Sequence, residues 1–296
     1  MRKEFFQLLM LGLGLGTSKD EEIPNGVDWE EVYGLASEQS VLGLVLAGID
    51  CLPNDQRPTK VQLLQWIGEV QMLEQQNHLL NKELVEFDAL CRENGCEYLV
   101  VKGQTLGCLY PKPEWRQSGD IDFLVPQKMR ADAVLQFSQM LGIEIPPIVE
   151  KEVGFDRNDI RYELHTSLRT WAKREHQKAW DALIEKEWEQ EHYVEIGGVK
   201  VRTLSPTMNA AYIFIHLFFH FMREGVSLRQ FCDWAMVLHH YKEEIDKDAL
   251  IQMLLGLSLF DAYCAFGTIL VDKLGLSIRE LPVPISDDDR NGKGRY

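Results

Sequence analysis

The chain has 296 residues, 45% of them hydrophobic and 26% charged, which is typical of a soluble globular protein with one large domain or two coupled ones. Its formal net charge of −15 repels a polyphosphate backbone and argues against binding of extended nucleic acid. No stretch reaches the roughly 18 to 20 apolar residues of a membrane span, so no membrane association is expected. Six cysteines without a CxxC pair indicate a reducing compartment and no zinc site.

The N-terminal stretch "MRKEFFQLLMLGLGLG" allows two interpretations, a signal peptide or an N-terminal helix of a cytoplasmic protein. Its apolar core is short and rich in glycine, Glu4 interrupts the basic start, and no small-x-small cleavage site follows. These features favour the helix, and we therefore predict a cytoplasmic protein.

Two further helices are predicted before residue 95. Apolar residues recur at helical spacing over residues 28–50. Pro58 suits the first position of a long helix that runs to about Asn94, and Gly95 suits its C-terminal end. Residues 1–94 are therefore predicted to form an N-terminal helical region.

Short strands and helices alternate between residues 95 and 204, which predicts a mixed sheet in a catalytic core. Gly197-Gly198 lies within an alternating stretch and predicts a two-residue hairpin turn. The expected strands and the hairpin cover residues 97–101, 120–125, 159–168 and 192–204. The expected helical segments cover residues 103–110, 126–141 and 171–190.

The remaining chain is predicted to be helical. Ser205 caps the next helix, with Pro206 in its first turn, and the helical pattern continues to about residue 276. Residues 277–296 are polar and are predicted to form a disordered tail. The sequence therefore predicts an α+β fold, in which a small mixed sheet over 95–204 is flanked by helical segments over 1–94 and 205–276.

Two acidic residues lie at the start of the second predicted strand, "DIDFLV". Side chains alternate across a strand, so Asp120 and Asp122 share one face, while Ile121, Phe123 and Val125 take the other. Two carboxylates this close repel each other unless a positive charge lies between them. A divalent cation with oxygen ligands is the natural partner, although a solvated strand edge is the alternative.

The third predicted strand, "DIRYELH", repeats this arrangement. Arg161, Glu163 and His165 fall on one face, opposite three apolar side chains. If this strand neighbours the second one, Glu163 becomes a third carboxylate over the same spot, and three acids suffice for two Mg²⁺ ions. The alternative for Glu163 is an ion pair with Arg161, and His165 is expected to be a hydrogen-bonded partner of the ligands.

A lysine-glycine step lies where the first predicted strand gives way to a short helix. Gly103 lets the backbone approach a phosphate closely, because it lacks a Cβ atom. The free N–H groups of the helix start favour an anion there. Lys102 and Arg116 can meet phosphate charge directly, although Lys102 also suits a plain surface position.

The stretch "VVKGQTLGCLYPKPEWRQSGDIDFLV", followed by "YELH", "HLFFH" and "LRQFCDW", resembles the uncharacterised nucleotidyltransferase family of the polymerase-β-like superfamily. The resemblance covers residues 30 to 275 and implies a nucleotidyltransferase-type sheet. The superfamily pattern is a glycine-containing turn, Asp-x-Asp on a strand and a further acid on a later strand. The Asp-x-Asp pair alone also occurs in haloacid-dehalogenase-like phosphatases and nucleotide-sugar glycosyltransferases, but "WRQSG" before Asp120 does not fit the phosphatases.

The resemblance carries over residue by residue. It implies that Gly103 marks the turn, that Asp120 and Asp122 are the metal pair, and that Glu163 is the third metal-binding acid. The usual Gly-Ser is here Gly103-Gln104, so the hydroxyl contact to the triphosphate is lost unless Thr105 replaces it.

Four polar residues of the C-terminal helices are placed near the active cleft by the resemblance. His216 and His220 are four residues apart in an apolar helix, which favours packed histidines facing the cleft over zinc ligands. Arg229 and Asp233 have the same spacing and can pair on one helix face. We expect these four, together with Arg161 and His165, to line the acceptor cleft or to support the metal ligands.

These observations predict a Mg²⁺-dependent transferase that moves a nucleoside monophosphate from a nucleoside triphosphate, such as ATP, to an unknown acceptor. Asp120, Asp122 and Glu163 would hold two Mg²⁺ ions. Lys102, Gly103, Gln104, Thr105 and Arg116 would bind the nucleotide. The acceptor is a small molecule or a protein side chain. The alternative function is a catalytically degenerate nucleotide-binding or protein-interaction module of the same fold.

Overall fold

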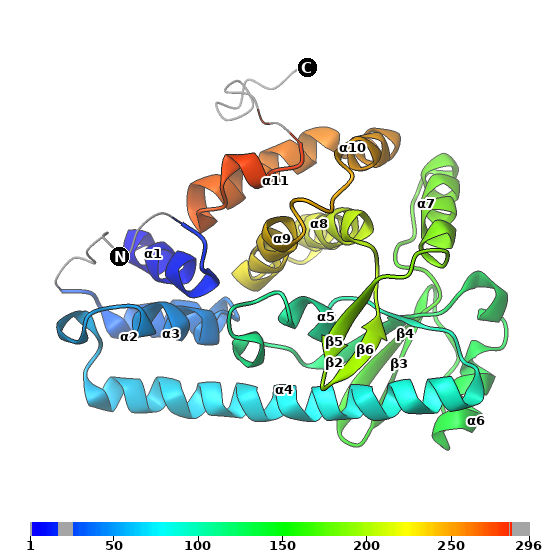
Figure 1. The fold of residues 1–296 in the computed structure, drawn as a ribbon, viewed down its shortest axis with the longest axis horizontal. Coiled ribbons are helices and arrows are strands. Elements are labelled where there is room, and N and C mark those ends of the chain that lie inside the picture. Colours follow the sequence, from blue (N-terminus) through cyan, green and yellow to red (C-terminus); the bar gives the residue numbers. More distant parts are fainter. Residues whose placement is uncertain (1, 17–25, 284, 286–296) are drawn as a thin grey trace. The chain divides into compact units, whose positions relative to one another are not determined.

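The structure is a computed structural model that describes residues 2–16, 26–283 and 285. The chain divides into two compact units, which are treated separately. The first unit consists of residues 1–75, 109–117 and 209–296, and the second of residues 76–108 and 118–208. The fold is α+β, as predicted, with helices and a small mixed sheet (Figure 1). Of the predicted tail, residues 278–280 form a 3-10 turn, and residues beyond 285 lie outside the described part.

The second unit is built on a four-stranded sheet with the strand order β1-β2-β4-β3. Strands β2 and β4 are parallel neighbours, and both edge strands run antiparallel to their neighbours. Strand β2 therefore lies beside β4, which was the condition for bringing the acids together. The strands are β1 (Leu99–Val100), β2 (Asp120–Leu124), β3 (Glu152–Arg157) and β4 (Ile160–His165).

Strand β3 was not predicted, which is an error in the sequence analysis. It forms a hairpin with β4 through Asn158 and Asp159, whose φ angles are 50° and 61°. Two consecutive left-handed residues are the requirement of a type I′ turn, and Asn and Asp tolerate that conformation better than most residues. The Asn-Asp pair was therefore a hairpin signal that the sequence analysis did not use.

Two helices cover the apolar face of this sheet. The C-terminal part of α4 (Lys60–Asn94) contributes Phe87, and α6 (Ala133–Leu141) contributes Phe137. Both rings pack against Phe123 of β2, with centroids 4.9 and 5.0 Å away. Since Phe123 alternates with the two aspartates of β2, this core fixes which strand face carries the acids.

The other elements of the second unit are short. The predicted hairpin is confirmed as β5 (Tyr193–Ile196) and β6 (Val199–Arg202), with φ angles of 57° and 82° at Gly197 and Gly198. The predicted helix over 126–141 is divided, because Pro126 is extended at ψ 155° and leads first into a 3-10 turn. The remaining elements are α5 (Gln104–Gly107), η3 (Gln127–Met129) and α7 (Arg174–Glu187).

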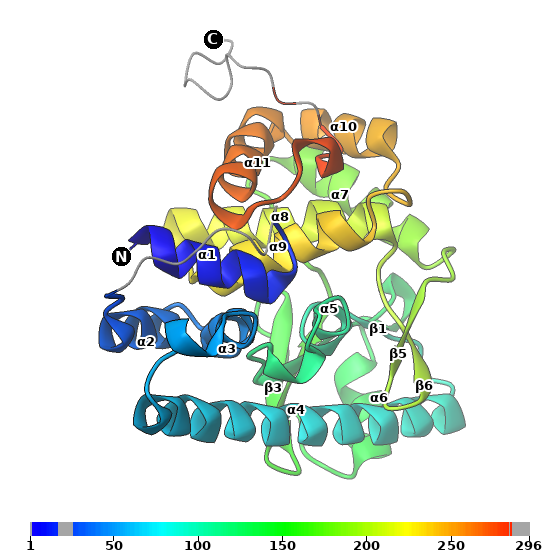
Figure 2. The same cartoon turned by 60° about the vertical axis from the view of Figure 1, so that its left-hand side comes forward.

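The first unit is helical. The expected helix over 28–50 is two helices, because Ser40 adopts a φ of 57° between them. Helix α1 (Arg2–Leu13) packs closely on α3 (Leu42–Asp50), and a Cβ atom on Gly12 or Gly48 would overlap a carbonyl oxygen of the other helix. Figure 2 shows α1 beside α3. The elements of this unit besides α4 are α1 (Arg2–Leu13), α2 (Trp29–Glu38), α3 (Leu42–Asp50), η1 (Asn54–Gln56), η2 (Pro113–Trp115), α8 (Pro206–Arg223), α9 (Leu228–His240), α10 (Lys247–Gly256), α11 (Phe260–Leu274) and η4 (Ile278–Glu280).

Several predicted helix ends are confirmed. Gly95 follows α4 with a φ of 65°, and the Met208 N–H donates to Ser205 Oγ at the start of α8. Within the described residues, no helix combines the length and the apolar character that crossing a membrane requires.

Candidate metal and nucleotide site

The parallel pairing of β2 and β4 places Asp122 directly opposite Glu163. One ligand atom from each of Asp122, Glu163 and His165 lies within 4.8 Å of the other two. His165 Nε2 is 2.8 Å from Asp122 Oδ1 and 3.6 Å from Glu163 Oε2. The sheet therefore gathers two carboxylates, whose oxygens suit a divalent cation, and an imidazole beside them.

Asp120 is not among the three residues whose ligand atoms lie within 4.8 Å of one another, although it lies on the same face of β2. It is the first residue of the strand, half-buried, and pairs in register with Arg161. The exposed Arg161 guanidinium forms an ion pair with Asp156 of β3 at 3.1 Å. Its path crosses Gly154, where a Cβ atom would overlap the guanidinium. The three residues gathered at the candidate metal site are thus Asp122, Glu163 and His165, and Arg161 faces the outer strand.

Strand β3 supplies a carboxylate that the sequence analysis did not identify. Glu152 is paired in register with His165, and its Oε2 lies 3.0 Å from His165 Nδ1. The imidazole therefore lies between two carboxylates, Asp122 on one nitrogen and Glu152 on the other. Such a partner orients the ring, which is how buried histidines near metals are commonly held.

The lysine of the Lys-Gly step reaches the same cluster. Lys102 Nζ lies 2.9 Å from Asp122 Oδ1. Lys102 has a φ of 63°, which is strained for a residue with a side chain, and Gly103 follows with a φ of 50°. A Cβ atom on Gly103 would lie 3.3 Å from the Asp120 carbonyl oxygen, so glycine relieves both the dihedral and the close approach.

The two neighbours of Gly103 use their polar groups within the protein. Gln104 is buried, and its side-chain N–H donates to Asn81 Oδ1 at 2.5 Å. The buried Thr105 hydroxyl donates to the Lys102 carbonyl oxygen at 2.8 Å. Both bonds fix the turn that carries Lys102.

The charges of the cluster shift one another's pKa values. Burial disfavours the Asp122 carboxylate, but the Lys102 ammonium and the bond from His165 outweigh burial and hold the pKa of Asp122 well below its ordinary value. Burial and the nearby charge of Asp122 raise the pKa of Glu163. Burial opposes protonation of His165, but its contacts with Asp122 and Glu152 prevail and raise its pKa. The close contact with His165 Nδ1 lowers the pKa of Glu152 to about 2. The cluster therefore favours a charged imidazole beside ionised Asp122 and Glu152.

A second buried ion cluster lies in the first unit. Arg116, which was expected to meet phosphate, donates from Nε and Nη2 to the two carboxylate oxygens of Asp233 at 2.6 and 2.8 Å. The Tyr110 hydroxyl donates to Asp233 Oδ1 at 2.7 Å. Arg229 donates to the Gln117 carbonyl oxygen at 2.9 Å. The main partner of Asp233 is thus Arg116, far away in sequence, and not the neighbouring Arg229.

The two histidines of α8 lie side by side in the first unit. The ring centroids of His216 and His220 are 4.4 Å apart, and both residues are half-buried. His220 Nδ1 lies 3.4 Å from Glu224 Oε2 on the next turn. The spacing thus places both rings on one helix face, and their expected role at the acceptor remains a prediction.

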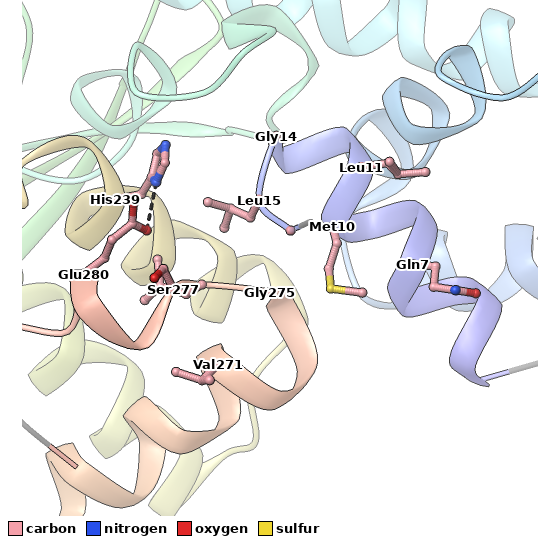
Figure 3. Close-up of a pocket in the computed structure, with 12 residues that line it drawn as sticks. Gln7, Met10, Leu11, Gly14, Leu15, His239, Val271, Gly275, Ser277 and Glu280 are labelled. Carbon is pink, nitrogen blue, oxygen red and sulfur yellow. Dashed lines mark hydrogen bonds and ion pairs between the residues drawn. The ribbon is translucent and has the colours of Figure 1, made fainter. Parts of the chain in front are cut away.

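The first unit also has an open pocket of about 530 Å³, lined by residues of α1 and by residues at the C-terminal end of α11. Met10, Leu15 and Val271 contribute apolar side chains, and His239 pairs with Glu280 at 3.0 Å on its edge (Figure 3). Its described lining contains none of the predicted site residues.

No curated protein matches. A solved structure, that of an antigenic nucleotidyltransferase-like protein from Paracoccidioides brasiliensis, is similar with 13% identity and a TM-score of 0.35, over 69% of this chain and 93% of that chain. The profile of the uncharacterised nucleotidyltransferase family matches residues 25–274. This match spans both units and includes Asp122, Glu163 and His165, and by it the chain belongs to the uncharacterised nucleotidyltransferase family.

Proposed function

We propose that the protein is a Mg²⁺-dependent nucleotidyltransferase that moves a nucleoside monophosphate from a nucleoside triphosphate to an acceptor hydroxyl or phosphate. The observation that carries this proposal is the cluster of Asp122, Glu163 and His165 on two parallel strands, within 4.8 Å of one another. Family membership supports the same reaction class.

The side chains divide into ligands and supporting groups. Asp122 and Glu163 offer carboxylate oxygens, which Mg²⁺ prefers, and Asp120 lies on the same strand face to complete the set. Bound Mg²⁺ would lower the pKa of the attacking hydroxyl and neutralise the pyrophosphate that leaves. His165 is better suited to orient Asp122 than to bind Mg²⁺, because its Nε2 already contacts Asp122 Oδ1.

The nucleotide side of the site is assigned to the Lys102-Gly103 turn. Lys102 carries the positive charge that a triphosphate requires, and Gly103 allows close backbone approach. Gln104 and Thr105 support this turn through their internal hydrogen bonds. The acceptor is a small molecule or a protein side chain. His216, His220 and Arg229 remain the residues proposed to contact it.

A second function, nucleotide binding without transfer, is favoured by one observation. The hydroxyl of Thr105 is bonded to the Lys102 carbonyl, and Gln104 stands where the superfamily has serine, so the usual hydroxyl contact to the triphosphate is missing from both positions. A degenerate member of the fold would keep the charged pocket and lose the chemistry.

The experiment that separates the two functions is incubation with each of the four labelled nucleoside triphosphates, Mg²⁺ and a cell lysate. Transfer predicts pyrophosphate release and a labelled acceptor, both abolished by Glu163→Gln. Glu163 is half-buried, so this variant should fold. Asp156→Asn is the matched control, because Asp156 is an exposed acid of the same sheet that pairs with Arg161. Nucleotide binding without pyrophosphate release, unchanged by either variant, would refute transfer and support the binding module.

A further inference from the structure

Lys102 and His165 contact the same oxygen of Asp122, one of the two that this carboxylate could offer to a divalent cation. Lys102 Nζ lies 2.9 Å from Asp122 Oδ1, and His165 Nε2 lies 2.8 Å from that same oxygen. A carboxylate oxygen offers two lone-pair sites, so two donors saturate Oδ1. A cation that binds through this oxygen must therefore displace one of the two side chains.

Lys102 is the partner that can leave. The His165 side chain is only 3% exposed and is held from its other nitrogen by Glu152 at 3.0 Å. The Lys102 side chain is 16% exposed, and its ammonium lies at the end of a flexible four-carbon stem and is strongly hydrated in water. Departure of Lys102 therefore costs less desolvation and less rearrangement than departure of His165.

The backbone directs the lysine onto Asp122. Lys102 follows β1 directly after Val101 and adopts a φ of 63°, which a residue with a side chain seldom does. The N–H and side-chain hydroxyl of Thr105 both donate to the Lys102 carbonyl oxygen, at 3.1 and 2.8 Å. Strain held in place by the surrounding bonds is typical of functional positions. The turn thus fixes the backbone of the lysine, whereas its ammonium lies at the end of a stem with four rotatable carbons.

We propose that Lys102 is the counter-ion of Asp122 before a metal binds, and that it leaves Asp122 on metal binding and turns to the triphosphate. The metal and the lysine would then exchange places on one carboxylate, so that the metal binds before the nucleotide. This inference rests on the proposed function, because it assumes that the cluster binds a divalent cation.

The first test measures the affinity for Mn²⁺, a spectroscopic probe for a hard divalent cation, by the loss of its free electron paramagnetic resonance signal. Without nucleotide, Lys102→Met should bind Mn²⁺ about tenfold more tightly than the wild type, because the competing positive charge is gone. Lys102→Arg keeps the charge and should bind as the wild type does. Lys128→Met removes an exposed lysine of the same unit, paired with Glu97, and controls for net charge.

The outcomes separate this inference from the proposed function. Equal or weaker Mn²⁺ binding by Lys102→Met, with clear binding by the wild type, would overturn the exchange and leave the metal site intact. Absence of Mn²⁺ binding by the wild type and by Lys102→Met would remove the metal site itself, and the proposed function with it.

A second test uses the wild-type protein and does not depend on the folding of a variant. Lysine acetylation is followed residue by residue with mass spectrometry. With a chelator, Lys102 should react slowly because it is paired and largely covered; Mn²⁺ should increase its rate at least fivefold by freeing the ammonium. Adding the non-hydrolysable α,β-methylene analogue of ATP to the Mn²⁺ protein should slow it again. Lys128 serves as the internal reference and should not change. Reaction of Lys102 at the same or a lower rate with Mn²⁺ would overturn the proposal.

Discussion

Replacing Asp233 with alanine should destabilise the protein strongly, because it leaves the buried guanidinium of Arg116 without its carboxylate partner. The side chain of Arg116 is 3% exposed and donates two of its hydrogen bonds to Asp233, at 2.6 and 2.8 Å. Removing one partner of a buried ion pair costs about 3–5 kcal/mol, since the remaining charge stays desolvated. The lost Tyr110 hydroxyl bond adds about 1 kcal/mol. We therefore expect a loss of about 4–6 kcal/mol in the free energy of unfolding.

Urea unfolding followed by far-ultraviolet circular dichroism measures this loss. The double variant Arg116→Met with Asp233→Leu removes both charges and should recover most of the stability, to within about 2 kcal/mol of the wild type. Asp50→Ala is the control in the same unit, because Asp50 forms an ion pair with Lys112 at 2.8 Å but both side chains are about half exposed. That variant should cost no more than about 1 kcal/mol.

The pH dependence of the free energy of unfolding tests the same prediction independently. Burial disfavours the Asp233 carboxylate, but Arg116 outweighs burial and lowers the pKa of Asp233 in the folded state. A lowered folded pKa contributes stability that is present above the unfolded pKa of about 4 and is lost as the pH falls through the folded value. The gap between the wild type and Asp233→Asn should therefore narrow below pH ~4. A cost under about 1 kcal/mol for Asp233→Ala, or a double variant no better than the single one, would refute this reasoning.

Three further predictions concern the metal cluster and the packing of α1. Asp122→Asn should abolish metal-dependent turnover. It should also lower the melting temperature of the metal-free protein, because Lys102 and His165 both lose their carboxylate partner. An equal or higher melting temperature would show that the contacts of Asp122 with these two side chains contribute nothing to folding. Gly103→Ala should lower the free energy of unfolding by about 1 kcal/mol, because the residue has a φ of 50°. It should also weaken nucleotide binding, measured by titration calorimetry. A nucleotide affinity equal to that of the wild type would show that the turn does not bind the nucleotide. Gly48→Ala should lower the free energy of unfolding in urea by about 1–3 kcal/mol, because the added Cβ atom would overlap the Leu8 carbonyl oxygen. An unchanged free energy of unfolding would mean that α1 and α3 can move apart at no cost.

The sequence predicted those elements whose signals are local. The Gly197-Gly198 hairpin and the Gly95 helix end depend on left-handed glycines, and both are confirmed by their φ angles. The helix over 28–50 was predicted as continuous because apolar periodicity does not report a single left-handed residue, and Ser40 breaks it. Ser40 is held by local bonds of a helix end, from the Val41 N–H to the Ala36 carbonyl oxygen and from its own N–H to that of Ser37, but serine gives no glycine signal for such an end.

The residues of the candidate site were predictable where the alternation of side chains along a strand determines which face they occupy. Alternation put Asp122, Glu163 and His165 on polar faces, and the parallel register of β2 and β4 brings them together. Alternation could not identify Glu152, because its position opposite His165 depends on strand β3, which was not predicted. It also could not pair Arg116 with Asp233, since no local spacing connects two residues that far apart in the chain.

The expected repulsion between the strand acids is settled by charges that the fold itself provides. Asp122, Glu163 and Glu152 lie among three cationic groups, Lys102, His165 and Lys151, so the cluster holds as many cations as carboxylates. These side chains therefore compensate one another's charge, which distinguishes the cluster from a structural metal site whose ligands are held together by the ion. A purely structural role would be served as well by apolar side chains, because buried ion pairs add little stability over packed hydrophobic residues. Charges retained at such a cost in desolvation are better explained by a ligand that the cluster binds, and a carboxylate pair with a movable lysine is suited to exchange one cation for another.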